Sequence, residues 1–163
     1  MSARKIVVMG VAGSGKSTIG ANLAQRLKAE FIDGDELHSV ESVAKMSKGV
    51  PLQDADRWPW LRKVGAVLHD TEGDCIIGCS ALKRVYRDLI RETAQDPVTF
   101  VHLHGSQAVL AARMSDRPGH FMPSSLLDSQ LEALEPLGED ENPIHIDIDQ
   151  PVDAIVASVV AAL

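Results

Sequence analysis

Residues 10–18 read Gly-Val-Ala-Gly-Ser-Gly-Lys-Ser-Thr and match the pattern GxxxxGK[ST] at every defined position. An apolar run, Lys5 to Met9, precedes them, and Lys16 to Lys28 has apolar residues at helical spacing. A strand, a glycine-rich turn and a helix in this order form the context in which the pattern binds phosphate. Backbone N–H groups of such a turn point inward, and the helix N-terminus adds a favourable dipole. The stretch therefore predicts a phosphate-binding loop for a nucleotide rather than an accidental glycine-rich turn.

Positions within this loop have distinct expected roles. Lys16 is a mobile cation that can reach the β- and γ-phosphates and stabilise the transferring phosphoryl group, and the Ser17 hydroxyl can bind Mg²⁺. We expect nucleotide contacts from Gly10, Ala12, Gly13, Ser14, Gly15, Lys16, Ser17 and Thr18.

The loop alone does not separate a kinase from a GTPase switch or a motor. The sequence contains no Asn-Lys-x-Asp segment of the kind that reads guanine. The apolar run from Cys75 to Cys79 ends in Ser80 rather than in the acidic pair that motors usually carry. These differences, together with the short chain, favour a small ATP-dependent kinase.

Two carboxylates follow the next short apolar run, Glu30 to Ile32. Asp33 and Asp35 flank Gly34, where both side chains can point into one crevice. We expect Asp33 to hold Mg²⁺, directly or through water, and Asp35 to act as the base that accepts the proton of a substrate hydroxyl. Asp-Gly is also a common turn dipeptide, so a plain turn is the alternative.

A group of basic and hydroxyl side chains suits an anionic acceptor. Arg57 lies just inside a predicted helix, beside Asp54 and Asp56. Its fork of donors can grip a substrate anion, although a surface ion pair is the alternative. Ser80 and Lys83 lie between a predicted strand and a predicted helix, where backbone N–H groups suit an anionic or polyhydroxy ligand.

A second basic group surrounds a segment rich in turn-forming residues, 116–123. We expect this segment, extended to about residue 125, to form a lid over the ligand, with a plain surface connection as the alternative. Arg117 is the expected lid arginine that stabilises charge on the transferring phosphoryl group. Arg113 is expected to pack its guanidinium against adenine. The stretch from Asp35 to Asp54 could also close over a ligand, as loops or short helices.

Two further groups of polar residues receive an ordinary structural interpretation. Arg84, Arg87 and Arg91 recur at helical spacing, and we interpret the last two as part of a solvated basic face. His102 and His104 alternate on one predicted strand and show no spacing typical of metal ligands.

Strand-like and helix-like runs alternate along the chain. Predicted strands cover residues 5–9, 30–32, 75–79, 98–104 and 144–148; predicted helices cover 16–28, 56–69, 82–93, 107–114, 124–134 and 152–162. Such alternation predicts an α/β fold with a parallel sheet and helices on both faces. Ligands bind such sheets at the carboxyl ends of the strands, where the motifs above fall. The length of 163 residues fits one domain.

Composition limits the possible partners. The formal net charge is −7, whereas nonspecific binding to nucleic acid or an anionic membrane needs a basic face. No apolar run approaches the ~18 residues of a membrane span, and no signal peptide is expected. Cys75 and Cys79 fit neither a redox nor a zinc pattern and are interpreted as reduced core thiols. We therefore expect a cytoplasmic enzyme without nucleic-acid or membrane partners.

Longer stretches resemble one family, the bacterial-type gluconate kinases of the shikimate-kinase-like P-loop group. The matching stretches are, in order, MGVAGSGKST, DGDELH, KMSKGVPLQDADRWPWL, CSALKRVYRDLIR and HFMPSSLLDSQLEALEPL. The combination is specific, because other P-loop kinases share the loop but not DADRWPWL or HFMPSSLL. The resemblance implies a three-layer P-loop kinase fold, a five-stranded parallel sheet in the order 2-3-1-4-5, a mobile lid and a homodimer.

The resemblance also implies a reaction, the transfer of the γ-phosphate of Mg-ATP to the 6-hydroxyl of D-gluconate. It supports Asp33 near the metal and Asp35 at the acceptor hydroxyl. It places Arg57 at the substrate carboxylate or nearby oxygens, with Ser80 and Lys83 alongside. Further substrate or lid positions that it implies are His38, His120 and Gln130.

The chain departs from the family pattern after His38. The family usually reads Pro-x-x-Asn there, whereas residues 39–42 read Ser-Val-Glu-Ser; losing an asparagine that contacts sugar hydroxyls would alter affinity or substrate range. Leu131 stands where an aromatic residue is common, which we expect to affect packing. Two alternatives therefore stay open: a kinase for another small sugar acid, polyol or nucleotide, and a nucleotide-sensing binding protein with little catalysis.

Overall fold

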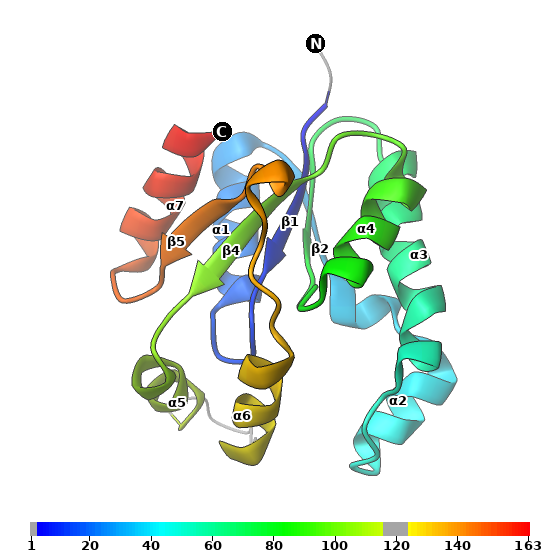
Figure 1. Cartoon of the computed structure of the whole chain (residues 1–163). Coiled ribbons are helices and arrows are strands. Elements are labelled where there is room, and N and C mark those ends of the chain that lie inside the picture. Colours follow the sequence, from blue (N-terminus) through cyan, green and yellow to red (C-terminus); the bar gives the residue numbers. More distant parts are fainter. Residues whose placement is uncertain (1–2, 116–123) are drawn as a thin grey trace.

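The computed structural model describes residues 3–115 and 124–163 and confirms the predicted α/β architecture (Figure 1). Five parallel strands form one sheet in the order β2-β3-β1-β4-β5. Most of the predicted lid lies outside the described residues, as do Arg117 and His120. Within the described ranges, no helix combines the length and the apolar composition that a bilayer span requires.

The central strand β1, Lys5–Met9, explains why the sheet is buried on both faces. It lies between β3, Cys75–Gly78, and β4, Thr99–His104, while β2, Glu30–Asp33, and β5, Ile144–Asp147, form the edges. All five residues of β1 are buried, which accounts for its continuous apolar pattern in the sequence. All five strands run in the same direction, so the loops that follow them gather at one end of the sheet, beyond the carboxyl ends of the strands.

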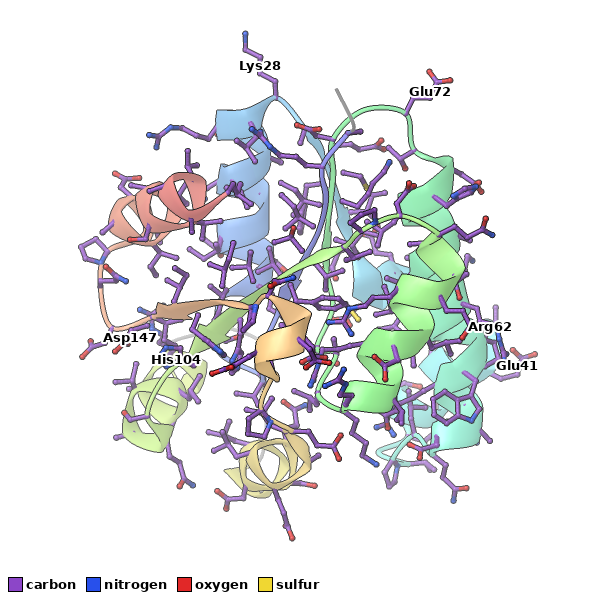
Figure 2. All side chains as sticks on the ribbon, turned by 45° about the horizontal axis from the view of Figure 1, so that its top comes forward. Lys28, Glu41, Arg62, Glu72, His104 and Asp147 are labelled. Atoms are coloured by element: carbon purple, nitrogen blue, oxygen red, sulfur yellow. The ribbon has the colours of Figure 1, made fainter. Side chains whose placement is uncertain are left out.

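Two layers of helices cover the sheet. Helices α1, Lys16–Leu27, and α7, Val152–Ala162, lie on one face, and α3, Asp54–Asp70, and α4, Arg84–Ala94, lie on the other (Figure 1). Alternate residues of β1 enter the two apolar cores: Ile6 and Val8 enter one, Val7 and Met9 the other. Exposed side chains such as Lys28 and Glu72 project outward (Figure 2).

The remaining elements lie near the carboxyl ends of the strands. Helices α5, Gln107–Ser115, and α6, Ser124–Ala133, are drawn beyond the arrowheads of β1 and β4 in Figure 1. The stretch between β2 and α3 contains a 3-10 helix, η1 (Gly34–Leu37), and the short helix α2 (Val40–Ser47). A second 3-10 helix, η2 (Glu139–Glu141), precedes β5.

Two element boundaries differ from the prediction for local reasons. Helix α3 begins at Asp54, two residues early, because Gln53 and Asp56 form its N-terminal cap. Helix α4 begins at Arg84 rather than at residue 82, because Ala81 has a left-handed φ of 46° and Lys83 is extended. The chain therefore turns sharply between β3 and α4, which leaves residues 80–83 as a loop.

The segment that departs from the family pattern begins a helix. Ser39 is the N-cap of α2, and its hydroxyl accepts a hydrogen bond from the backbone N–H of Ser42 (3.1 Å). Serine is among the preferred N-cap residues because its side chain satisfies an otherwise free N–H group. Residues 39–42 thus have a local structural role.

The interpretation of Arg87 as part of a solvated basic face is wrong. Its side chain has no exposed surface, and the guanidinium donates to the carboxylate of Glu141 (3.0 and 3.3 Å). It also donates to the backbone carbonyls of Ala81 (3.0 Å), Leu82 (3.1 Å) and Glu135 (3.1 Å). Arg87 therefore joins α4 to the 80–83 loop and to the segment that follows α6.

Three histidines cluster where β4 and β5 pair. His102 lies opposite His145 in the register, with the two Nδ1 atoms 3.3 Å apart, and the ring of His104 lies within about 6 Å of both other rings. His102 is only 7% exposed. Burial, followed by the nearby His145, His104 and Arg87, lowers its pKa from 6.5 to about 4. The neutral ring is therefore the stable form of His102 in the folded protein.

We expect the free energy of unfolding to fall as the pH is lowered from about 6.5 toward 4. In this window the unfolded chain binds a proton on His102 that the folded protein does not, so protons favour unfolding, by up to roughly 3 kcal/mol. Urea unfolding of the wild-type protein and of His102→Gln across this range measures the effect. The variant should lose part of the pH dependence; identical slopes would contradict the assignment.

Candidate active site

The phosphate loop, residues 10–18, connects β1 to α1 as predicted. A Cβ atom on Gly10 would lie 2.8 Å from the carbonyl oxygen of Leu103 and 2.6 Å from Oγ of Ser14, so this position requires glycine. Gly15, the N-cap of α1, has a left-handed φ of 91°, which glycine adopts without steric cost. The loop thus delivers the chain directly into the N-terminus of a helix, the arrangement that binds phosphate.

The two predicted metal ligands lie together. The Ser17 hydroxyl donates to Oδ2 of Asp33 (3.4 Å), which brings an oxygen donor from α1 next to one from the end of β2. Among residues 3–115 and 124–163, no group of three or more His, Cys, Asp or Glu side chains is arranged to hold a metal ion. Mg²⁺ usually keeps several waters and binds one or two carboxylates together with substrate phosphates, which fits this sparse donor set.

Lys16 lies folded across its own loop. Its ammonium group donates to the carbonyls of Gly10 (3.0 Å) and Val11 (3.2 Å). Its long side chain starts at the first residue of α1, close to where phosphates would lie.

The acidic segment after β2 forms a turn and also presents two carboxylates, Asp33 and Asp35. Oδ1 of Asp33 accepts a hydrogen bond from the backbone N–H of Asp35 (3.0 Å) and so caps η1. A Cβ atom on Gly34 would lie 2.4 Å from the carbonyl oxygen of Gly78, so the turn packs tightly against the end of β3. Asp35 itself is exposed to solvent at this edge of the sheet. The backbone therefore forms the turn that was the alternative interpretation, and the Asp35 carboxylate is still accessible for a role in catalysis.

Trp60 holds this turn in place. Its indole N–H donates to the carbonyl of Gly34 (2.7 Å), and its ring stacks on His38 with centroids 4.1 Å apart. Burial lowers the pKa of His38, Asp35 opposes this shift and Arg57 adds to it. His38 is thus a predominantly neutral ring held in place by Trp60.

The predicted acceptor residues Arg57 and Lys83 converge on an acidic residue, Asp54. The Arg57 guanidinium and the Lys83 ammonium each lie 3.7 Å from Oδ1 of Asp54. The hydroxyl of Tyr86 donates to the same oxygen, and Arg57 also contacts that hydroxyl (3.4 Å). We call Asp54, Arg57, Lys83 and Tyr86 the charge cluster.

The charge cluster perturbs the groups within it. The Tyr86 hydrogen bond, followed by Lys83 and Arg57, holds the pKa of the Asp54 carboxyl below its usual range, although desolvation opposes the shift. Burial, together with the Asp54 hydrogen bond, raises the pKa of Tyr86 to about 12. Sequence reasoning missed Tyr86 as a site residue; the available signal was its position in the first turn of α4, three residues after Lys83.

Ser80 and Lys83 lie in a loop that the segment after α6 holds in place. The backbone N–H of Glu135 donates to the carbonyl of Leu82 (2.8 Å), and the Glu135 carboxylate accepts from the backbone N–H of Arg84 (2.8 Å). Ser80 is partly exposed. Together with the buried Arg87, these bonds fix the backbone of the loop.

Gln130 and Arg113, two of the predicted site residues, make hydrogen bonds to segments that the sequence analysis did not predict as their partners. Oε1 of Gln130, on α6, accepts a hydrogen bond from the Ala12 N–H in the phosphate loop (2.6 Å). The Arg113 guanidinium donates to the carbonyl of Ile148, just after β5. The expected stacking of Arg113 on adenine stays a prediction, as do the roles of Arg117 and His120.

The comparisons with known proteins agree with this geometry. A family model described as "AAA domain" matches residues 6–137. A "Thermosensitive gluconokinase" of Escherichia coli (strain K12) is 43% identical, over 93% of this chain and 83% of that protein. A "Gluconokinase" of Gluconobacter oxydans is 44% identical, over 96% of this chain and 89% of that protein.

Solved structures extend the comparison. The crystal structure of a gluconokinase from Sinorhizobium meliloti 1021 is 50% identical, with a TM-score of 0.90, and covers 98% of this chain and 90% of that chain. A shikimate kinase from Aquifex aeolicus, at 15% identity, 97% coverage of this chain, 94% of that chain and a TM-score of 0.62, shares the fold. Since relatives at 43–50% identity match more than nine tenths of its length, this chain belongs to the gluconokinase family of P-loop kinases.

Proposed function

We propose that this chain transfers the γ-phosphoryl group of ATP to the 6-hydroxyl of D-gluconate and forms 6-phospho-D-gluconate and ADP. The relatives at 43–50% identity named above are gluconokinases. The observation that carries the proposal is the contact between Ser17 and Asp33. It joins the phosphate loop to the turn that presents Asp35, so a nucleotide phosphate and a proton acceptor would meet at one edge of the sheet.

The phosphate loop and the acidic turn would hold Mg-ATP. The Ser17 hydroxyl and the Asp33 carboxylate are hard oxygen donors that suit Mg²⁺, which neutralises charge on the phosphates when bound. Lys16 would exchange its carbonyl partners for the β- and γ-phosphates. Arg117 would stabilise the transferring group from the lid, and Arg113 would pack on adenine.

Asp35 would act on the acceptor. Its carboxylate takes the proton of the 6-hydroxyl as that oxygen forms a bond to the γ-phosphorus and the bond to the ADP oxygen breaks. Arg57 and Lys83 would bind the gluconate carboxylate, and Ser80 a nearby oxygen. Further contacts would come from His38, His120 and Gln130.

The setting of the enzyme is also part of the proposal. We propose a homodimer that works in the cytoplasm without nucleic-acid or membrane partners. The net charge of −7 supports the exclusion of polyanionic partners.

A coupled ADP-release assay with Mg-ATP and a panel of acceptors tests the reaction. We expect the highest kcat/KM for gluconate, about tenfold or more above other sugar acids, hexitols and nucleoside monophosphates, since only gluconate pairs the carboxylate with every hydroxyl contact. Equal turnover of another acceptor would favour the alternative kinase. Nucleotide binding without turnover above the ATP-only background would favour a binding protein and contradict the proposal.

A further inference from the structure

The charge cluster contains a carboxylate in the position where an acceptor anion would bind. Arg57 and Lys83 are a third exposed (32% and 35%), and each lies 3.7 Å from Oδ1 of Asp54. Asp54 is itself 46% exposed. An incoming carboxylate that reaches these two cations must therefore lie close to the carboxylate of Asp54.

The charges of the cluster define what it can neutralise. Arg57 and Lys83 contribute two positive charges and Asp54 contributes one negative charge. The hydroxyl of Tyr86 stays neutral, since its pKa is raised to about 12. The cluster therefore carries a net charge of +1. One bound carboxylate neutralises this charge, whereas a doubly charged group leaves the site with a net negative charge.

We propose that Asp54 is a specificity-determining residue, which lowers the net charge of the acceptor-anion site to +1 and so reduces the advantage that doubly charged acceptors would have over singly charged ones. This inference rests on the proposed function, in which Arg57 and Lys83 bind the acid group of the acceptor. Asp54 weakens the attraction for every anion, and it weakens it most for anions of higher charge.

An asparagine at position 54 separates the charge from the structural role. Asn keeps the shape of Asp and an Oδ1 that accepts the hydrogen bond of Tyr86. It loses a favourable interaction of the first-turn carboxylate with the N-terminus of α3, a change that thermal unfolding of the variant measures separately. Substitution by Asn thus removes the charge and keeps the hydrogen bond from Tyr86 that positions the side chain at residue 54.

The test compares three open-chain acceptors that share the 6-hydroxyl and differ at C1. These are D-glucitol (neutral), D-gluconate (one negative charge) and D-glucitol 1-phosphate (two negative charges at pH 8). For charges about 5 Å apart in a water-like dielectric, Asp54→Asn should improve kcat/KM about fourfold per unit of ligand charge. We expect no change for glucitol, about a fourfold gain for gluconate and about a fifteenfold gain for the phosphate ester.

Asp88→Asn is the matched control. Asp88 lies on α4, pairs with Arg84 and Arg91 rather than with Arg57 or Lys83, and is 54% exposed, so the variant removes the same charge from outside the ion pairs of the cluster. This control variant should leave the ratios of kcat/KM among the three acceptors unchanged. An equal shift for all three acceptors in Asp54→Asn, or a weaker binding of gluconate, would overturn the proposal, because Asp54 would then position the cations.

Arg57→Gln distinguishes failure of this inference from failure of the proposed function. If the acceptor site is correct, this variant raises the KM for gluconate and leaves that for glucitol unchanged. If Arg57→Gln changes neither, the acceptor-anion site is wrong and the role of Asp54 falls with it. If Arg57→Gln acts as expected but Asp54→Asn shows no dependence on ligand charge, only the inference about Asp54 is wrong.

Discussion

Replacing Asp35 with Asn is expected to lower kcat with gluconate about 10²- to 10⁴-fold and to leave the KM for ATP within about threefold. The amide has nearly the same shape but cannot accept the proton of the 6-hydroxyl. The nucleotide contacts should persist, because Asp35 is an exposed side chain beyond the residues that contact the phosphate loop. Steady-state kinetics with ATP and gluconate varied in turn measure both values.

Glu36→Gln is the control for Asp35. Glu36 is the next residue of η1 and is also exposed, so this variant removes the same charge from the same turn. It should retain kcat within about threefold. If the Asp35 and Glu36 variants lose activity equally, the effect is one of local charge and Asp35 is not the base.

Replacing Arg87 with Met is expected to lower the free energy of unfolding by about 3–5 kcal/mol. The substitution leaves the carboxylate of Glu141, whose side chain is 1% exposed, without its main partner. The carbonyls of Ala81, Leu82 and Glu135 lose a donor as well. Arg91, 3.1 Å from Glu141, compensates only in part, because it is itself shared with Asp88. Urea unfolding measures the change.

Arg84→Met provides the contrast. Arg84 is 42% exposed and pairs mainly with the exposed Asp140, with a longer contact of 3.7 Å to Glu141, so its loss should lower the free energy of unfolding much less than the loss of Arg87. The double variant Arg87→Met/Glu141→Leu should regain much of the stability, because no buried charge is left unpaired. Equal losses in Arg84→Met and Arg87→Met would show that the burial of Arg87 has no energetic consequence.

The features that the sequence predicted well have determinants that lie close together in the chain. The phosphate loop is defined by nine consecutive residues, and the left-handed torsion of Gly15 belongs to the loop itself. The strands followed from short apolar runs, and the strand order from the family resemblance. The acidic turn was also predictable, since Asp33 caps the residue two positions later.

The features that were missed depend on contacts between distant positions. Arg87 is buried because Glu141, 54 residues later, faces it, and helical spacing alone could not distinguish it from a solvated arginine. Tyr86 joined the site through Asp54, 32 residues earlier. The contact between Ala12 and Gln130 spans 118 residues, and no periodic pattern encodes a pairing of that kind.

The short segment from Gln130 to Glu135 connects the two loops that would bind the nucleotide and the acceptor. Gln130 accepts a hydrogen bond from the phosphate loop, and Glu135 is bonded to Leu82 and Arg84, so the chain from the end of α6 links the phosphate loop to the 80–83 loop. A displacement of either loop would therefore act on the same short segment. By thermodynamic reciprocity, any change that ATP makes in the affinity for the acceptor is matched by an equal change that the acceptor makes in the affinity for ATP.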